Sequence, residues 1–395
     1  MRIEAAFLST MLAATALAEP VAAQNTFMDV GRQAPITILI NSSPWFGGFE
    51  KVVRLYEEQT GNKVNLDVTP FGGMLEKARN AVRGGTSPYD ILNLDTQWTI
   101  EFYAGGFLTP LKAIDPGFDL PKEVFRYDDS GYWNAERKWR TSEGGDLMAY
   151  PPNGNVHLLF YRGDLYDKAG LKRPETWDDV IAACEKLQNR PNTYGYVFRG
   201  ERGNAIRFDW MPLMLGFGAS IEKDASKGDF TVTINSPEAK KALDLLIDLA
   251  KRCGPPNIGA LGQGDLIQSL STGKSVQGHV VVAAWSNFDD AKKSAVVGKI
   301  QAAVMPRPKD GTHGVVIGNW HFVVPKNVPD DRKRAVIAFS KWFLTPQAQK
   351  AYLEGGSIPV RSDVLTPDLA GKPEYRWVKP YLDSQQYAKQ VLGYA

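Results

Sequence analysis

The sequence predicts an α/β protein built of two lobes. Short apolar runs of strand length alternate with helical patterns, which is typical of a sheet with helices on its faces. The same alternation recurs in the second half of the 395-residue chain, whose length suits two or three domains of about 150 residues each. Hydrophobic residues make up 43% of the chain and charged residues 23%, so each lobe can bury a core.

The first predicted unit is a strand, a polar turn and a helix. Residues 36–41, ITILIN, form a short β-branched run, and residues 42–45 follow as the turn. Apolar side chains then recur at the helical spacing i, i+3, i+4 and i+7, at Phe49, Val52, Val53 and Tyr56. Gly61 should end this helix, because glycine adopts the left-handed conformation of a C-cap without strain.

The rest of the N-terminal half repeats this order. Alternating apolar residues predict a second strand over 64–68, and residues 74–82 are expected to form a helix. A continuous apolar run predicts a third, buried strand over 91–94.

In the C-terminal half, capping residues predict where three helices begin. Thr176 with Asp179 forms a capping box before a helix over 177–187. A cap residue followed by proline predicts two more helix starts, at Ser236-Pro237 and at Thr345-Pro346. In the helix that starts at Ser236-Pro237, four apolar side chains should lie on one face, those of Leu243, Leu246, Ile247 and Ala250.

Charge and the N-terminus suggest the setting in which the protein works. The 46 Lys and Arg nearly balance the 44 Asp and Glu, so the net charge of +2 does not point to nucleic acid, and we expect an uncharged partner. Residues 1–23 combine Arg2, an apolar stretch over 5–18 and the small residues Ala22 and Ala23, the pattern of a cleaved secretory signal peptide. No cysteine lies near the cut, so we expect an exported, periplasmic protein without a lipid anchor.

The chain has two cysteines, Cys184 and Cys253. An oxidising compartment would permit them to pair, but two buried free thiols fit the sequence equally well. Only their geometry can decide.

Candidate ligand-binding residues stand where predicted strands end. In open α/β sheets, ligands bind beyond the carboxyl ends of the strands. The turns and interruptions there combine aromatic with hydrogen-bonding side chains, at Ser43, Trp45, Phe71, Asp95, Gln97, Trp98, Trp285, Asn287, Asn319 and Trp320. Trp210, in the turn-like stretch 207–212, is a further candidate.

This mixture of residues suits a sugar or a polyol. Such ligands have weakly apolar C–H faces, against which an aromatic ring stacks, and hydroxyls that each need a partner. The alternative is structural: each tryptophan could belong to the core, and Asp95 could cap the next helix.

Signals of catalysis or of a cofactor are weak. None of the four histidines has the i, i+4 spacing of a metal-binding helix, and no Gly-x-Ser-x-Gly motif occurs. The Gly-Lys-Ser of 273–275 lacks the glycine that a phosphate-binding loop needs, since Gln268 stands there, so it is expected to be a turn before a strand. No catalytic residue, metal ligand or cofactor is predicted.

Six segments carry a resemblance to a known family. They are residues 89–111, 149–187, 273–285, 319–326, 335–349 and 357–364. In this order they resemble the extracellular solute-binding proteins of carbohydrate ABC importers, the family (family 1) of maltose-, glucose- and polyol-binding proteins.

The resemblance implies a periplasmic-binding-protein fold, with two discontinuous α/β lobes around a central ligand cleft and hinge crossovers between them. Lobe 1 would comprise residues 24–150 and 283–325, and lobe 2 residues 151–282 and 326–395. It also implies that Asn153, Asn155 and Arg361 join the aromatic residues at the cleft. The resemblance further implies that the lobes close around the ligand and that the permease recognises the closed form.

We therefore expect the periplasmic component of an ABC transporter, a monomer that binds a neutral sugar or sugar alcohol and delivers it transiently to its permease without catalysis. One alternative is an exported carbohydrate-active enzyme, which would turn over a glycoside. Another is the same fold holding a polyamine or a ferric ion, which would need convergent carboxylates or a cluster of metal ligands.

Overall fold

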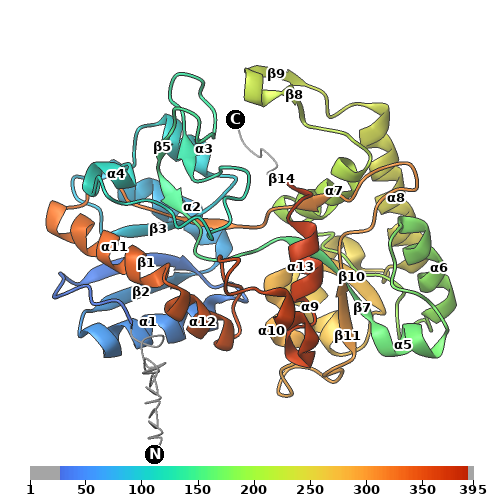
Figure 1. Ribbon diagram of the computed structural model, residues 1–395. Helices are drawn as coiled ribbons and strands as arrows, with labels where there is room; N and C mark the ends of the chain where they lie inside the picture. Colours follow the sequence, from blue (N-terminus) through green and yellow to red (C-terminus); the bar gives the residue numbers. More distant parts are fainter. Residues whose placement is uncertain (1–26, 390–395) are drawn as a thin grey trace, which may run out of the picture.

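The computed structural model describes residues 27–389, whose chain builds two main β-sheets, one in each of two lobes (Figure 1). The predicted signal peptide, residues 1–23, lies outside the described residues. None of the helices between residues 27 and 389 combines the length and the hydropathy of a membrane-spanning segment.

Lobe 1 is built on a five-stranded sheet of order β2-β1-β3-β13-β6. Its strands are β2 (Val64–Thr69), β1 (Ile36–Asn41), β3 (Ile91–Asp95), β13 (Trp320–Val323) and β6 (Ala149–Tyr150). β1 runs parallel to β2 and β3, whereas β13 runs antiparallel to β3 and β6. The start of β13 therefore lies at the edge where β3 ends.

Helices from both ends of the chain pack in lobe 1. They are α1 (Phe46–Thr60), α2 (Phe71–Arg83), α3 (Thr99–Ala104), α4 (Leu111–Ile114), α11 (Asp330–Phe343) and α12 (Pro346–Glu354). Contacts join α11 to β1 and α12 to α1, and Figure 1 shows these two orange helices beside the blue strands. The aromatic core between them includes Phe49, whose ring meets Phe322, Phe339 and Phe343.

Lobe 2 is built on an antiparallel sheet of order β10-β7-β11. Its strands are β10 (Gln277–Val281), β7 (His157–Arg162) and β11 (Ile300–Ala303). Its helices are α5 (Gly163–Lys168), α6 (Trp177–Leu187), α7 (Asn204–Gly216), α8 (Pro237–Cys253), α9 (Gln263–Ser271), α10 (Trp285–Phe288) and α13 (Val378–Ser384).

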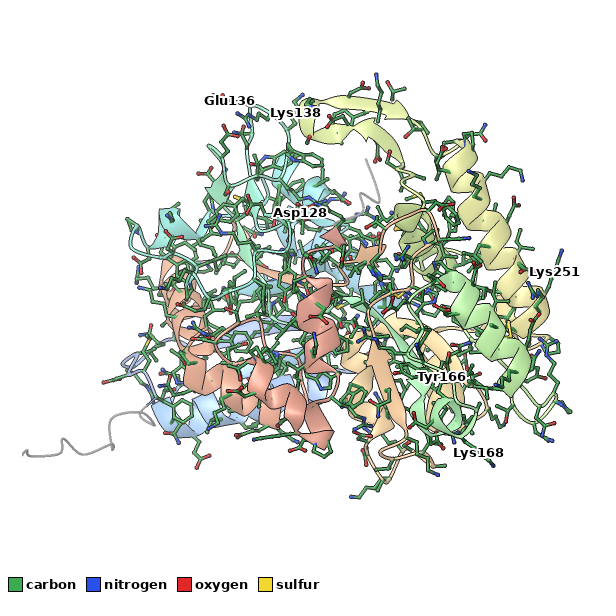
Figure 2. The ribbon with its side chains drawn as sticks, turned by 45° about the vertical axis from the view of Figure 1, so that its right-hand side comes forward. Asp128, Glu136, Lys138, Tyr166, Lys168 and Lys251 are labelled. Atoms are coloured by element: carbon green, nitrogen blue, oxygen red, sulfur yellow. A yellow bond between two sulfur atoms is a disulfide. The ribbon has the colours of Figure 1, made fainter. Side chains whose placement is uncertain are left out.

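Short strand pairs complete the molecule. They are β4 (Tyr132–Trp133) with β5 (Asp146–Leu147), β8 (Glu222–Asp224) with β9 (Asp229–Val232), and β12 (Val315–Val316) with β14 (Ala388–Lys389). Figure 2 shows Glu136 and Lys138 in the loop between β4 and β5, and Lys251 on the outer side of α8. In both views the β8–β9 hairpin extends from lobe 2 towards the side of lobe 1 that carries this loop.

The predicted lobe boundaries differ from these contacts in two places. The prediction assigns residues 283–325 to lobe 1, but β11 pairs with β7 of lobe 2. It assigns residues 326–395 to lobe 2, but α11 and α12 pack in lobe 1, whereas α13 contacts β7 and β11 of lobe 2. Periodicity marks an element without showing which sheet it joins, so the prediction has the right number of crossings between the lobes but misplaces the second and the third.

Most of the predicted elements are present. β1 spans the predicted residues, α1 ends at Gly61 with φ 70°, and the Thr176–Asp179 capping box starts α6. Two details are wrong. α2 begins at Phe71, so residues 71–73 are helical rather than a turn. α8 leaves Leu243 and Ile247 exposed, and its buried face runs through Ala239, Ala242, Leu246, Leu249 and Cys253.

Three chain segments cross between the lobes and meet at one place. Residues 151–156 lead from β6 to β7, residues 317–319 lead to β13, and residues 355–377 lead from α12 to α13. The backbone N–H of Gly154 donates to the carbonyl oxygen of Ile358 at 2.9 Å, and that of Gly318 donates to Asn155 at 2.9 Å. A Cβ on Gly154 would lie 2.4 Å from the carbonyl oxygen of Pro359, so only glycine fits here.

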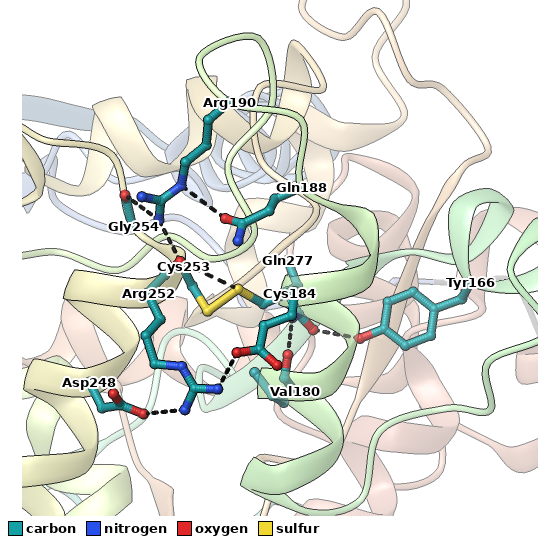
Figure 3. Close-up of a disulfide and its surroundings, with 11 residues drawn as sticks. Tyr166, Val180, Cys184, Gln188, Arg190, Asp248, Arg252, Cys253, Gly254 and Gln277 are labelled. Atoms are coloured by element: carbon teal, nitrogen blue, oxygen red, sulfur yellow. Dashed lines mark hydrogen bonds and ion pairs between the residues drawn. A yellow bond between two sulfur atoms is a disulfide. The ribbon is translucent and has the colours of Figure 1, made fainter.

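Cys184 and Cys253 form a disulfide between α6 and α8 (Figure 3). The geometry thus decides the question that the sequence left open. The bridge closes a loop with a sequence separation of 69 residues, and both half-cystines are fully buried in lobe 2.

We expect the double variant Cys184→Ala/Cys253→Ala to lose about 4 kcal/mol of unfolding free energy, because the bridge restricts a long loop in the unfolded chain. Urea unfolding of the wild type and the variant measures the difference. Dithiothreitol should destabilise the wild type similarly and leave the variant unchanged. A loss below about 1 kcal/mol would contradict a stabilising role.

Candidate functional site

A cavity of about 400 Å³ lies between the lobes. Lobe 1 contributes Asn41, Ser42, Ser43, Pro44, Phe71, Asp95 and Trp320 to its wall. Lobe 2 contributes Arg199, Glu201, Arg202, Asn204, Ala205, Phe208, Gln263 and Val281, and the crossing segments contribute Asn155 and Gly318. Because its wall comes from both lobes, the cavity would change with any movement of one lobe against the other.

Strand order brings the lobe 1 residues together. Asn41 ends β1 and Asp95 ends β3, and the two parallel strands end at the same edge of the sheet. Trp320 begins the antiparallel β13 and pairs directly with Asp95. Ser43 follows β1, and its hydroxyl donates to Asn41 Oδ1 at 2.7 Å.

Three aromatic rings form one side of the site. Trp98 lies against Phe71 at 5.2 Å between ring centroids and meets Trp320 edge-on at 5.7 Å. Phe71 also meets Trp320 edge-on, at 6.0 Å. Both indoles are 6% exposed, whereas Phe71 is 38% exposed. The indoles thus support Phe71 as the more accessible apolar surface.

The N-terminus of α7 forms the facing wall in lobe 2. Gly203, with φ 102°, turns the chain into this helix, and no side chain caps its first turn. The preceding residues 196–198 run parallel to β10, since Val197 is bridged to Gly278. Arg199 therefore follows a short strand-like segment, in the same way that the lobe 1 residues follow strands.

Arg199 is held by a buried carboxylate, Asp209. Its backbone N–H and Nε donate to Asp209 at 2.6 and 2.8 Å, and Nη2 donates to the same carboxylate. Burial alone would raise the pKa of Asp209, but the Arg199 charge and the adjacent histidines hold it well below its usual range. The charge of Arg199 is thus compensated within lobe 2.

Two buried histidines surround this pair. Arg199 Nη2 lies 3.0 Å from His157 Nε2, and burial lowers the pKa of His157 to about 4. His279 Nε2 lies 2.9 Å from the carbonyl oxygen of Asp209, and its Nδ1 lies 2.5 Å from the hydroxyl of Tyr196. Burial also lowers the pKa of His279. The network fixes Arg199 rather than leaving it mobile.

Asp95 is the carboxylate of lobe 1 in the cavity wall. Burial raises its pKa to about 6, although a hydrogen bond from the Gln97 backbone and the charges of Arg207 and Arg199 act in the opposite direction. The Gln97 N–H donates to Asp95 Oδ1 at 3.0 Å. Asp95 therefore stabilises its own turn and also lines the cavity, but it does not cap α3, whose N-cap residue is Trp98 and has no side-chain cap.

One hydrogen bond joins the lobes across the site. Arg207 Nη1, in α7, donates to Gln97 Oε1, in lobe 1, at 2.7 Å. The Nε2 of Gln97 is buried and has no hydrogen-bond partner among the residues of the structure. The NH2 group of Gln97 therefore has no acceptor among the described residues.

Gln97 and Trp98 line a second, adjoining cavity of about 770 Å³. It shares Phe71 and Asn204 with the first cavity. Its other lining residues are Gly72, Leu75, Arg79, Ile100, Glu101 and Ala104.

Asparagine side chains tie the crossing segments to one another. Asn153 Oδ1 accepts from the backbone of Trp320 at 3.3 Å, and Asn319 Oδ1 accepts from that of Asn155 at 2.6 Å. Asn155 Oδ1 accepts from Ala283 at 3.1 Å. Asn153 and Asn319, both fully buried, thus shape the crossings, while Asn155 also lines the cavity.

The other predicted site residues do not line either cavity. Trp45 is buried against Phe49 in the lobe 1 core, and Trp210 lies partly buried within α7. Arg361 is paired with Asp363 and Glu123.

Trp285 and Asn287 lie in α10, behind the lobe 2 sheet. Trp285 packs against Phe160 and Phe288, and the guanidinium of Arg376 lies 4.4 Å from its ring centroid. Asn287 Nδ2 donates to Ala284. The 3₁₀ turn of residues 282–284 carries the chain away from the cleft after β10.

Sequence reasoning missed the whole lobe 2 wall, which includes Arg199, Glu201, Arg202, Asn204, Phe208 and Gln263. The sequence does contain a pattern that could have identified these residues. The apolar run 196–198 is followed by the glycine-rich turn RGERGN and a helix. It is the same order of strand, turn and helix that identified Ser43 and Asp95.

Comparison with known proteins agrees with this architecture. A family model described as bacterial extracellular solute-binding protein matches residues 41–350. A protein of Sinorhizobium fredii, named probable amino-acid ABC transporter periplasmic-binding protein, is 25% identical over 340 residues, which cover 85% of this chain and 74% of that protein. The mannitol-binding protein of Pseudomonas aeruginosa is 26% identical over 267 residues, 66% of this chain and 57% of that one.

The fold is shared with solved structures. An ABC transporter solute-binding protein from Agrobacterium radiobacter, crystallised with ribitol, has a TM-score of 0.76 at 22% sequence identity. The match covers 92% of this chain and 90% of that chain.

We expect Asp209→Ala to cost about 3–5 kcal/mol of unfolding free energy, because it leaves the Arg199 guanidinium buried without a carboxylate. The matched control is Asp244→Ala, which removes the exposed Lys240–Asp244 pair of the same lobe and should cost less than about 1 kcal/mol. Urea unfolding at pH 7 compares the two variants. Equal losses of unfolding free energy in the two variants would show that the buried Arg199–Asp209 pair stabilises the fold no more than an exposed pair does.

Proposed function

Because the chain belongs to the family of bacterial extracellular solute-binding proteins, we propose that it is the solute-binding component of an ABC importer and holds a neutral sugar or sugar alcohol between its lobes. The observation that carries this proposal is the interlobe cavity, in which the accessible ring of Phe71 lies among hydrogen-bonding groups from both lobes. Its volume of about 400 Å³ lies in the range of small-molecule sites.

The polar groups of the wall suit hydroxyls. Asp95 and Glu201 can accept hydrogen bonds, Arg199 and Arg202 can donate them, and the side-chain amides of Asn41 and Gln263 can do both. The Nδ2 of Asn41 is buried with no partner among the described residues, so a ligand oxygen could accept its proton. A hydroxyl buried unpaired costs about 1–3 kcal/mol, so such a ring of partners would select the arrangement of hydroxyls.

The charges of the wall favour a ligand without net charge. Arg199 is balanced by Asp209, Asp95 lies within the influence of the Arg207 charge, and Glu201 and Arg202 are neighbours in the chain. A polyamine would meet the arginines as well as the carboxylates. No group of three or more His, Cys, Asp or Glu suited to a metal ion occurs among residues 27–389.

The names of relatives and the ligand of the solved structure also support a polyol. One relative is a mannitol-binding protein, and one structural neighbour was crystallised with ribitol. The Sinorhizobium fredii relative carries an amino-acid name, so amino acids belong among the controls. Because these relatives are named as binding proteins, we propose binding without catalysis.

We also propose that the predicted signal peptide directs the chain to the periplasm, where it works as a monomer. Lobe movement at the three crossings would close the cleft, and the closed form would meet the permease.

A thermal-shift panel tests the proposal. Its members are mannitol, ribitol, common monosaccharides and disaccharides, with amino acids, spermidine and ferric ion as controls. We expect one neutral polyhydroxylated compound to raise the melting temperature in a concentration-dependent way, because a ligand of the native state stabilises it. A shift with a control alone, or release of sugar from a glycoside, would overturn the proposal.

Phe71→Ala should weaken binding of the responding compound at least about tenfold, because it removes the accessible stacking surface. The matched control is Phe230→Ala, since Phe230 is 49% exposed on β9 and lines neither cavity. Isothermal titration calorimetry gives both affinities. Unchanged binding in Phe71→Ala would remove this ring from the site.

The affinity should also depend on pH through Asp95. The ionised carboxylate accepts stronger hydrogen bonds from hydroxyls than the protonated acid does, so Kd should rise as the pH falls through about 6. His157 and His321 stay neutral over this range, because burial lowers their pKa values to about 4 and about 3. Titration at pH 5 and 7.5 measures the change.

In the Asp95→Asn variant, this pH dependence should vanish and binding should be weak at both values. The same rise of Kd in the variant as in the wild type would assign the effect to another group.

A further inference from the structure

The second cavity differs in chemistry from the first and adjoins it directly. Both cavities are lined by Phe71 and Asn204, so they meet at the aromatic ring of lobe 1 and at the start of α7. The second, at about 770 Å³, is large enough for a further group of the same ligand.

The wall of the second cavity is largely apolar. Phe71 and Leu75 of α2, Trp98, and Ile100 and Ala104 of α3 form it. Leu75 and Ile100 are partly buried, which leaves part of each side chain accessible to a ligand. Apolar surface that remains accessible at a binding site favours an apolar partner.

The charged residues of this wall satisfy each other. Arg79 Nε and Nη2 donate to the two carboxylate oxygens of Glu101, each at 2.8 Å. A bidentate pair of this kind needs no counter-charge from a ligand. The second cavity therefore does not require a charged group.

The wall of the second cavity includes a side-chain NH2 group without a hydrogen-bond partner among the described residues, that of Gln97. Gln97 is 5% exposed, its Oε1 accepts from Arg207, and its buried Nε2 has no partner among the residues of the structure. A single oxygen next to an apolar group, as in a glycosidic linkage, would satisfy this donor. A second sugar ring would bring several hydroxyls to a wall with few partners for them.

We propose that the natural ligand is a glycoside with an apolar aglycone. Its sugar lies in the first cavity, its glycosidic oxygen accepts from Gln97 Nε2, and its aglycone lies against Leu75, Trp98 and Ile100. This inference rests on the proposed function, because it assigns the sugar to the same cleft.

The test compares methyl and phenyl glycosides of glucose, galactose and mannose, together with cellobiose, lactose and mannobiose, by isothermal titration calorimetry. For the sugar that binds, the phenyl glycoside should bind at least about tenfold more tightly than the methyl glycoside, because the ring buries additional apolar surface. Equal affinities of the two glycosides would overturn the proposal, as would tighter binding of the disaccharide.

Leu75→Asn should abolish the gain from the phenyl group and leave the affinity for the methyl glycoside unchanged. The matched control is Leu243→Asn, because Leu243 is 45% exposed on α8 and lines neither cavity. A phenyl gain that survives in Leu75→Asn would place the aglycone elsewhere and overturn the assignment.

The two proposals fail differently. If free sugars or polyols bind but the phenyl group adds nothing, the aglycone site is wrong and the proposed function stands. If no neutral sugar, polyol or glycoside binds, both proposals are wrong.

Discussion

The meeting of three chain crossings at one point is the constraint on which the rest of the structure depends. Gly154 has no room for a side chain, because the third crossing passes against its backbone. Asn153 and Asn319 each accept a hydrogen bond from the backbone of another crossing. These bonds give the buried backbone N–H groups of Trp320 and Asn155 a protein partner in place of water. The lobes are thereby joined at a defined place beside the cleft.

The directions of the strands beside the crossings determine which residues line the cleft. Because β13 is antiparallel to β3, Trp320 enters the sheet where Asp95 leaves it, and these two directly opposed residues supply both an aromatic and a carboxylate. In lobe 2, residues 196–198 run parallel to β10, and the chain then turns at Gly203 into α7. The two lobes thus use the same device, a turn between a strand and a helix, from opposite sides of the cavity.

Local patterns predicted the elements well and the site in part. Ser43, Phe71 and Asp95 follow parallel strands, so the rule about strand ends located them. Trp285 also follows a strand, but the 3₁₀ turn after β10 directs it behind the sheet, and no periodicity in the sequence signals that turn. Trp45 stands in the turn after β1, yet its ring packs into the core against Phe49. The lobe of α11 and α12 depends on contacts between distant segments, which a single sequence does not reveal.

Internal pairing of charges explains how a cleft containing several arginines can suit a neutral ligand. Arg199 is balanced by Asp209 and Arg79 by Glu101, so neither needs an anionic ligand. Arg207 donates across the cleft to Gln97, which draws α7 towards lobe 1 and leaves the Gln97 Nε2 as an unpaired donor. Burying that donor without a partner costs free energy, and a ligand oxygen placed there would recover it. In the proposed complex, a ligand that binds Gln97 would therefore stabilise the same approach of the two lobes that the Arg207 bond favours, so binding and closure would be coupled through one side chain.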